Sequence, residues 1–154
     1  MNVDTLIERM ALSDVLSAYA IGVDGRDIER LTACFDERIH VDFDAFAPGM
    51  TGTYDGSEWA ERIMRGVRGF DATQHVIGNH LYTVDGDQAE VTAEVIASHT
   101  IDGERLTVAG RYRHEFVKLD GAWRIRAYWL TPSWIEGSMD LFARAAERGR
   151  QSTG

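Results

Sequence analysis

His75 lies in the segment "DATQHVIGNHLYTVDGD" (residues 71–87), whose alternating apolar residues predict a half-buried β-strand. Side chains alternate between the two faces of a strand, so His75 shares a face with Ile77, Asn79 and Leu81. An imidazole aimed at an apolar core can be a hydrogen-bonded core residue, a metal ligand or a catalytic base. The choice depends on which other polar groups face the same side.

Two later segments also place polar side chains among apolar ones. In one predicted strand, His99 shares a face with Val91 and Val95, and in the next, Tyr112 and His114 lie on the apolar side. A single such residue is most often a hydrogen-bonded core residue, but several on one sheet face are typical of a polar-lined pocket. The inward-facing polar residues are His75, Asn79, His99, Tyr112 and His114.

A metal site is one function that these residues could serve. Its ligands would be His75, His99 or His114 together with a carboxylate, if the separate strands brought them together. The sequence contains no HExxH, CxxC or His-x-His pairing, which are the closely spaced patterns of many metal sites. We therefore expect no bound metal and no cofactor.

Acid–base catalysis is the second function. A histidine base needs a partner on its other ring nitrogen, and the candidate is Asp24 in "YAIGVDGRD". This residue would end the first helix, where the helix dipole disfavours an anion by roughly 0.3–1 kcal/mol. A capping role is therefore a weak explanation for Asp24, and a turn residue beside Gly25 is the plain alternative.

The first half of the chain predicts helices and one strand. A helical stripe precedes Asp24, Asp27 is the expected N-cap of a short second helix, and Ser57 that of a third. Residues 38–46 alternate as a strand, residues 47–56 read as a loop, and a last helix is expected over 138–147. The apolar helix positions are Leu12, Val15, Leu16, Tyr19 and Val23 in the first helix, Leu31 and Phe35 in the second, and Trp59, Ile63, Met64 and Val67 in the third.

Three Asp-Gly pairs separate β-rich segments in the second half. They are Asp85-Gly86, Asp102-Gly103 and Asp120-Gly121, and Asp-Gly is a strong hairpin signal because tight turns need positive φ. Helices followed by a four-stranded antiparallel meander predict an α+β domain. A curved sheet with the N-terminal helices on its concave side would enclose a pocket.

The composition of the chain excludes several classes of binding partner. The chain has 154 residues, enough for one domain over 1–154, and its net charge of −9 disfavours nucleic acid and anionic membranes as partners. No apolar run approaches the roughly 20 residues that span a bilayer, and the acidic N-terminus does not predict a signal peptide. With Cys34 as the single cysteine, we expect a cytoplasmic protein that binds a small molecule.

The order of these segments resembles the SnoaL-like branch of the nuclear transport factor 2-like superfamily over nearly the whole chain. The resemblance rests on "YAIGVDGRDIERLTACF", "IHVDFDAF", "TQHVIGNH" and "FVKLDGAWRI". It is closest to scytalone dehydratase, bile-acid 7α-dehydratase and hexachlorocyclohexane dehydrochlorinase, which use an aspartate near the end of the first helix and a histidine on the strand after the third. Those positions match Asp24 and His75. The resemblance implies a cone-shaped α+β barrel and a homo-oligomer, with a trimer favoured over a dimer.

Other positions depart from these enzymes. The dehydrochlorinase lysine is replaced by Tyr19, as in the bile-acid enzyme, where a tyrosine serves. His99 matches a second site histidine of scytalone dehydratase, whereas that enzyme's strand serine and asparagine fall at Gly110 and Tyr112, and its first-strand tyrosine at Phe43. The substrates of these enzymes therefore do not carry over to this chain.

The resulting hypothesis is a cofactor-free lyase, most simply a dehydratase. His75, paired with Asp24, would remove a proton next to a carbonyl, and Tyr19 would hydrogen-bond the carbonyl oxygen or the departing hydroxyl. An isomerase or cyclase would begin with the same step, and a non-catalytic ligand-binding or oligomerisation domain is the other alternative. Expected substrate-binding residues are His99, Tyr112, Asn79, Phe43, Phe46, Trp129 and Phe142, and with Trp134 the aromatic residues suggest an apolar, cyclic substrate.

Overall fold

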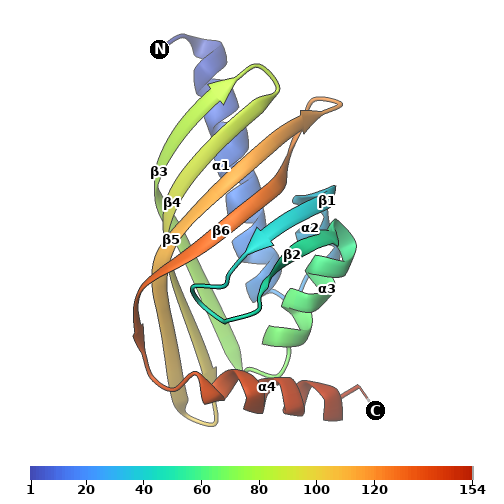
Figure 1. Cartoon of the computed structure of the whole chain (residues 1–154), viewed down its shortest axis with the longest axis vertical. Coiled ribbons are helices and arrows are strands. Elements are labelled where there is room, and N and C mark those ends of the chain that lie inside the picture. Colours follow the sequence, from blue (N-terminus) through green and yellow to red (C-terminus); the bar gives the residue numbers. More distant parts are fainter. Residues whose placement is uncertain (154) are drawn as a thin grey trace.

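Residues 1–153 are described by a computed structural model. Within them lie four helices and six strands (Figure 1). The helices are α1 (Val3–Asp24), α2 (Ile28–Ala33), α3 (Gly56–Val67) and α4 (Asp140–Gln151). The strands are β1 (Phe35–Asp42), β2 (Thr51–Asp55), β3 (Ala72–Asp85), β4 (Gln88–Ile101), β5 (Glu104–Leu119) and β6 (Ala122–Glu136).

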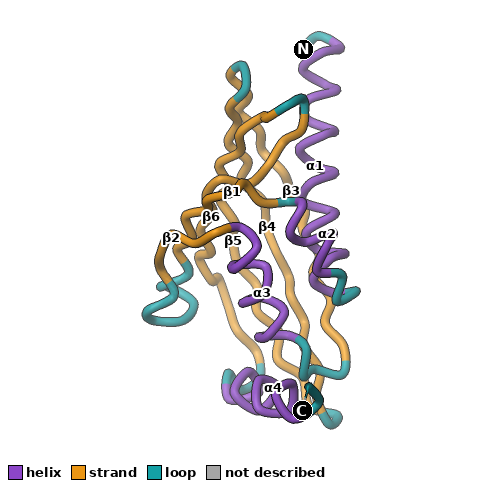
Figure 2. Tube along the Cα trace, turned by 90° about the vertical axis from the view of Figure 1, so that its right-hand side faces the viewer, coloured by secondary structure: helices purple, strands orange, loops and turns teal. Residues whose placement is uncertain are grey.

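The strands form one curved sheet in the order β2-β1-β6-β5-β4-β3. All neighbours are antiparallel except β1 and β6, which are parallel. The helices gather on one side of the sheet, and α4 crosses the far end of its long strands (Figures 1 and 2). The expected α+β class, with a curved sheet and N-terminal helices around a pocket, is confirmed. Within residues 1–153, β2 and β3 do not pair, so the cone stays open between them.

The three Asp-Gly pairs lie at the hairpin turns of the meander as predicted, although the first turn has Gly86 and Asp87 at its centre, because Asp85 still pairs with Gln88. Asp102 and Asp120 have φ of 51°, and the glycines that follow them have φ of 79°. Positive φ at both central residues is the geometry of the tight hairpin turn that matches strand twist. Between these turns, β4 and β5 pair without interruption from Gln88 opposite Val117 to Ile101 opposite Glu104. The inner faces of β4 and β5 are therefore the predicted ones.

Several predicted boundaries in the first half were wrong. The segment 47–56, predicted as a loop, contains the edge strand β2, and Phe35 begins β1 rather than extending the second helix. Helix α3 starts at Gly56 after Asp55, so Ser57 does not cap it. Helix α4 runs two residues later at its start and four later at its end than the predicted 138–147. The alternation of β2 is only five residues long, too short to separate a strand from a loop.

A bulge in β3 changes which side chains face inward. Gly78 pairs with Glu94 and Leu81 pairs with Thr92, so two residues, Asn79 and His80, stand opposite one on β4. Asn79 has φ of 54°, and asparagine tolerates this left-handed conformation better than most residues do. Beyond the bulge the face of each side chain is reversed. Asn79 and Leu81 are exposed, so their predicted inward orientation is wrong.

Helix α4 approaches the connection between α3 and β3 very closely at Gly69. A Cβ added to Gly69 would lie 1.7 Å from the Ala145 carbonyl oxygen, a separation that no real contact permits. Arg148 of α4 also donates to the Gly69 carbonyl at 2.7 Å. The absence of a side chain at position 69 is therefore what lets α4 pack at this end of the sheet.

Replacing Gly69 by Ala should lower the free energy of unfolding by about 2 kcal/mol or more, because α4 must move away to relieve the overlap. Gly66→Ala is the matched control, since nothing lies within 4 Å of a Cβ built there. That substitution, inside α3, should instead stabilise the fold by about 0.5–1 kcal/mol. Urea titrations of both variants measure the two effects. Equal stabilities for the two variants would contradict the packing described for α4.

Candidate active site

The centre of the candidate site is a contact between His75 on β3 and Asp24, the last residue of α1. The Nδ1 atom of His75 lies 2.7 Å from Oδ1 of Asp24. The backbone N–H of His75 donates to the other carboxylate oxygen, Oδ2, also at 2.7 Å. Both side chains are largely buried, with exposed fractions of 8% for His75 and 22% for Asp24. Both the imidazole and the backbone N–H of His75 thus hold the Asp24 carboxylate in place.

Thr73 and Arg26 support this contact. The Thr73 hydroxyl donates to Oδ1 of Asp24 at 3.0 Å, and the Arg26 guanidinium donates to the Thr73 hydroxyl at 2.7 Å. The Arg26 guanidinium also donates to the Val23 carbonyl at 2.8 Å, so that this carbonyl near the end of α1 accepts from both the side chain and the backbone of Arg26. It adopts φ of 55°, so the chain turns sharply after the helix and brings the guanidinium back over Asp24.

Asp24 is ionised at neutral pH. Burial alone would raise the pKa of its carboxyl, but hydrogen bonds from the His75 side chain and backbone and from Thr73 outweigh burial and hold the pKa below its ordinary value. An ionised carboxylate only accepts hydrogen bonds. His75 therefore carries its hydrogen on Nδ1 when neutral, which leaves the lone pair on Nε2 at the opposite side of the ring.

A cavity of about 520 Å³ lies beside His75, within the range of small-ligand pockets. Its wall is mostly apolar, and α1, α3, α4, the loop after β1 and the sheet all contribute to it. Asp24 stands behind His75 rather than in the wall. The lining residues that had been expected from the sequence are Tyr19, Phe43, Phe46, His75, His99, Tyr112 and Phe142.

His99 is the second histidine in the cavity wall. Its ring centroid lies 5.7 Å from that of His75, with the rings at 81° to each other. Burial, together with the nearby His75, lowers the pKa of His99 to about 4, so it is neutral at neutral pH. Its buried Nδ1 has no hydrogen-bond partner within residues 1–153. His99 therefore contributes a neutral imidazole to the cavity wall.

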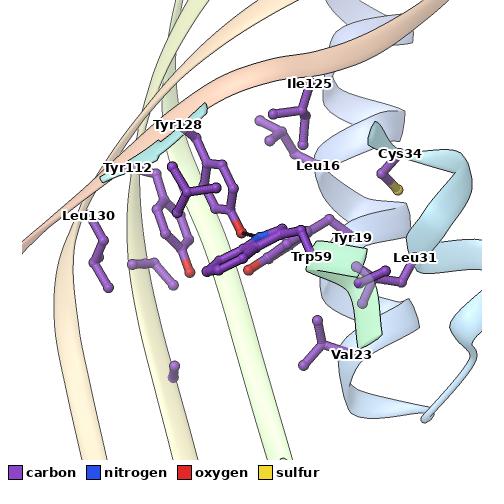
Figure 3. Packing of buried hydrophobic residues seen from close by; sticks show 14 of the residues in the cluster. Leu16, Tyr19, Val23, Leu31, Cys34, Trp59, Tyr112, Ile125, Tyr128 and Leu130 are labelled. Atoms are coloured by element: carbon purple, nitrogen blue, oxygen red, sulfur yellow. Dashed lines mark hydrogen bonds between the residues drawn. The ribbon is translucent and has the colours of Figure 1, made fainter. Parts of the chain in front are cut away.

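Three tyrosines bring their hydroxyl groups toward one region of the core (Figure 3). Tyr19 and Tyr112 line the cavity, and Tyr128 lies behind them, where its hydroxyl accepts a hydrogen bond from Trp59. Burial raises the pKa values of Tyr19 and Tyr112 well above the ordinary value of 10. Both phenols therefore keep their protons at neutral pH.

Three residues expected to contact a substrate lie elsewhere. Trp129 is outside the cavity wall. The Arg113 guanidinium carbon lies over the Trp129 ring, 4.4 Å from the ring centroid. A register shift in β6 next to Ile125 turns Tyr128 rather than Trp129 inward. Asn79 is turned out by the bulge in β3, and Trp134 is half exposed on the last part of β6. Their predicted place at the pocket is wrong.

The sequence profile of the SnoaL-like domain matches residues 4–128. The chain belongs to the SnoaL-like domain family. The resemblance that the helix-end aspartate and the strand histidine suggested is therefore confirmed. No curated protein matches the sequence.

Solved structures similar to this SnoaL-like domain agree in fold. The Kfla4162 protein from Kribbella flavida is 25% identical with a TM-score of 0.82, and 95% of this chain and 99% of that chain are covered. A proposed scytalone dehydratase from Novosphingobium aromaticivorans is 25% identical, with a TM-score of 0.76 and coverage of 90% and 92%. A hexachlorocyclohexane dehydrochlorinase, LinA-type3 from Novosphingobium barchaimii, is 22% identical, with a TM-score of 0.76 and coverage of 90% and 95%, and shows likeness of fold alone.

Fold, family and cavity together indicate a small-molecule-binding domain. Within residues 1–153, no group of three or more His, Cys, Asp or Glu is arranged to hold a metal ion. In that same part of the chain, no helix is long and apolar enough to cross a membrane.

Four residues that support the polar groups of this SnoaL-like site were not predicted from the sequence. Thr73 could have been found, because it lies two residues before His75 and so shares its face of β3. Trp59 and Tyr128 were assigned to the core or not singled out, and their mutual hydrogen bond joins positions 69 residues apart in the chain. Arg26 gave no signal, since a positive φ at a residue other than glycine cannot be recognised from an alternating pattern.

Proposed function

We propose that this chain is a cofactor-free lyase, a single SnoaL-like domain over residues 1–154, that removes water from a cyclic β-hydroxy carbonyl compound. The observation that carries the proposal is the 2.7 Å contact between His75 and Asp24 at the wall of an apolar cavity. A buried histidine that paired with a carboxylate but lined no cavity would need no role other than stabilising the fold. A histidine that lines a cavity of ligand size and has its tautomer fixed by a carboxylate has the features of a general base.

The first step uses the free nitrogen of His75. Nε2 takes the proton from the carbon next to the substrate carbonyl, and Asp24 stabilises the imidazolium that forms. The electron pair of the broken C–H bond moves toward the carbonyl oxygen. Tyr19 donates a hydrogen bond to that oxygen, and Tyr112 and the neutral His99 hold the substrate beside it. A donor placed where negative charge develops contributes roughly 10²-fold in rate.

The second step expels the hydroxyl group on the next carbon. The C–O bond breaks with its electron pair, and the proton held on His75 Nε2 passes to the departing oxygen, so water leaves and a conjugated double bond forms. His75 is then neutral again with its hydrogen on Nδ1. Every electron stays within the substrate and the water, so the reaction calls for no redox partner.

Two alternatives start from the same site. An isomerase would return the proton from His75 to a different carbon of the substrate, and a cyclase would use the carbanion to attack a second carbonyl. A binding domain without turnover would use the same wall but would not need the contact with Asp24. The lyase is favoured because His99, Tyr19 and Tyr112 all line the cavity and offer several polar groups for two substrate oxygens.

Incubation with 3-hydroxy-1-tetralone tests the proposal. This cyclic β-hydroxy ketone fits a cavity of about 520 Å³, and loss of water followed by tautomerisation gives fluorescent 1-naphthol. We expect turnover above the buffer rate that is abolished in His75→Gln. A series of cyclic β-hydroxy ketones that all bind without turnover would instead favour the ligand-binding alternative.

We also propose self-association into a trimer, as the family resemblance implied. Val76, Ile96 and Trp134 expose apolar surface on the strands β3, β4 and β6, with exposed fractions of about one half. Burial of such surface between copies would be favourable. Light scattering at micromolar concentration should give three times the chain mass of 17.2 kDa, and a monomer mass would contradict the proposal.

A further inference from the structure

The charged groups at the cavity wall have one sign. The whole chain contains 25 acidic and 16 basic residues. Yet among the described residues that line the cavity there is no aspartate or glutamate, and the two that carry a permanent charge are Arg62 and Arg65. A cavity with this wall, in a protein of net charge −9, is locally suited to a molecule with a negative group.

The two arginines mark the mouth of the cavity. Both belong to α3, three residues apart, and both are exposed, as is Gly49 of the loop opposite. The groups expected to contact the reacting atoms are at the closed end, where Tyr19 and Tyr112 are almost fully buried. A molecule with its reactive carbon at His75 would therefore extend along the apolar wall toward the arginines.

Arg65 is the freer of the two. Arg62 lies 3.6 Å from the Glu58 carboxylate and 4.5 Å above the Tyr54 ring centroid, so its guanidinium already has partners. Arg65 forms no ion pair and no side-chain hydrogen bond with any residue in 1–153. A guanidinium at a cavity mouth with all its donors available matches a carboxylate in two parallel hydrogen bonds.

We propose that the substrate is an organic acid: an apolar, ring-sized body with a carboxylate at the end remote from the reactive carbon, which Arg65 binds at the mouth of the cavity. This inference rests on the proposed function for the position of the reactive end. Valines and leucine along the wall, such as Val95, Val108 and Leu130, contact the apolar body. The carboxylate remains partly in water, so its contact with Arg65 sets orientation and selectivity more than total affinity.

Binding of three naphthalene probes tests this inference without any turnover. Isothermal titration should give a dissociation constant for 2-naphthoate about three- to tenfold lower than for methyl 2-naphthoate, which has the same rings and no charge. The difference should shrink as sodium chloride rises from about 20 to about 500 mM, because the contact is exposed. The third probe, 2-naphthyl phosphate, distinguishes a carboxylate site from a phosphate site.

Arg65→Gln should bring the two dissociation constants to within about twofold of each other, chiefly by weakening naphthoate binding. Arg68→Gln is the matched control, because Arg68 is an exposed arginine three residues further on that does not line the cavity. It should leave the preference for naphthoate unchanged. A protein that binds naphthoate through Arg65 but shows no lyase activity would refute the proposed function alone.

Several results would overturn the inference. They are equal affinity of the wild-type protein for the acid and the ester, equal losses in Arg65→Gln and Arg68→Gln, which would indicate a diffuse field rather than a contact, and binding of the phosphate more than about tenfold tighter than that of the carboxylate. Absence of binding for all three probes would overturn it as well, since the apolar wall is expected to accept the naphthalene ring system.

Discussion

Replacing His75 by Gln should lower the rate of elimination by about 10²–10⁴-fold, the contribution of a positioned general base, while the fold is retained. Glutamine is similar in size and can still donate a hydrogen bond to Asp24, so the contact between α1 and β3 survives. It has no lone pair that accepts a proton at neutral pH. The measurements are turnover of a cyclic β-hydroxy ketone and the melting temperature of the same sample.

A plain core histidine predicts the opposite pattern, a lower melting temperature with turnover nearly intact, and that result would remove the lyase mechanism. His80→Gln is the matched control on the same strand. His80 is partly buried on β3 but does not line the cavity. Its replacement should leave turnover within about twofold of the wild-type rate, because His80 lies outside the cavity wall and substitutions away from packed or buried networks have small effects on the fold.

Asp24→Asn completes this prediction. The amide preserves the shape of Asp24 and can still accept from the His75 backbone N–H, but it removes the negative charge that stabilises the imidazolium. The loss should again be about 10²–10⁴-fold, and the double variant should be little worse than either single one, because residues that act as a unit fail together. Additive losses would show that the two residues act separately.

The sequence predicted the inner faces of β4 and β5 because these strands pair without interruption, so a period of two residues holds along their whole length. The same reasoning failed on β3 beyond Gly78. One extra residue reversed the faces there, and the residues that follow include large side chains on both faces, Leu81 and Tyr82 among them. A bulge of this kind leaves no mark in an alternating pattern.

Only part of the candidate site could likewise be predicted from the sequence. His75 and His99 could be placed on the inner face from their own strands alone. The partner of His75 lies 51 residues away in the chain, and local patterns carry no information on such a contact. Asp24 was a candidate because it lies at a helix end where capping does not explain a carboxylate, and the family resemblance supported it and supplied Tyr19. The surroundings of Asp24, which lower the pKa of its carboxyl, depend on the turn at Arg26 and needed the structure.

His114 carries the second large expected effect, on stability in acid. It is fully buried between Tyr112, Phe116 and Tyr128, with its ring stacked on Tyr128 at 5.5 Å and 7°. Neither ring nitrogen has a hydrogen-bond partner in the described part of the chain. Burial lowers the pKa of His114 to about 3, against a smaller opposing effect of the Val91 backbone and with a small further contribution from His80. The folded protein therefore holds this imidazole neutral.

Because the folded pKa lies below that of the unfolded chain, near 6.5, the unfolded state binds the additional proton as the solution is acidified. The contribution of His114 to stability is fully present above pH 6.5 and is lost as the pH falls toward 3. The loss is about 1.4 kcal/mol for each pH unit in that window. Carboxyls with lowered pKa values, such as those of Asp24 and Asp71, lose their contribution to stability only below about pH 4. Between about pH 6.5 and 5, histidines therefore dominate the change of stability with pH.

His114→Phe should therefore flatten the dependence of unfolding free energy on pH between about 6.5 and 5 by about one proton, or about 1.4 kcal/mol per pH unit. Part of the slope should remain, because His99, with a pKa lowered to about 4, contributes in the same window. Urea titrations at half-unit pH intervals measure the slope. Phe116→Leu, two residues along the same strand, is the control and should lower stability equally at every pH. His114→Leu serves if phenylalanine proves too large, and an unchanged slope in both His114 variants would show that this imidazole is not held neutral by the fold.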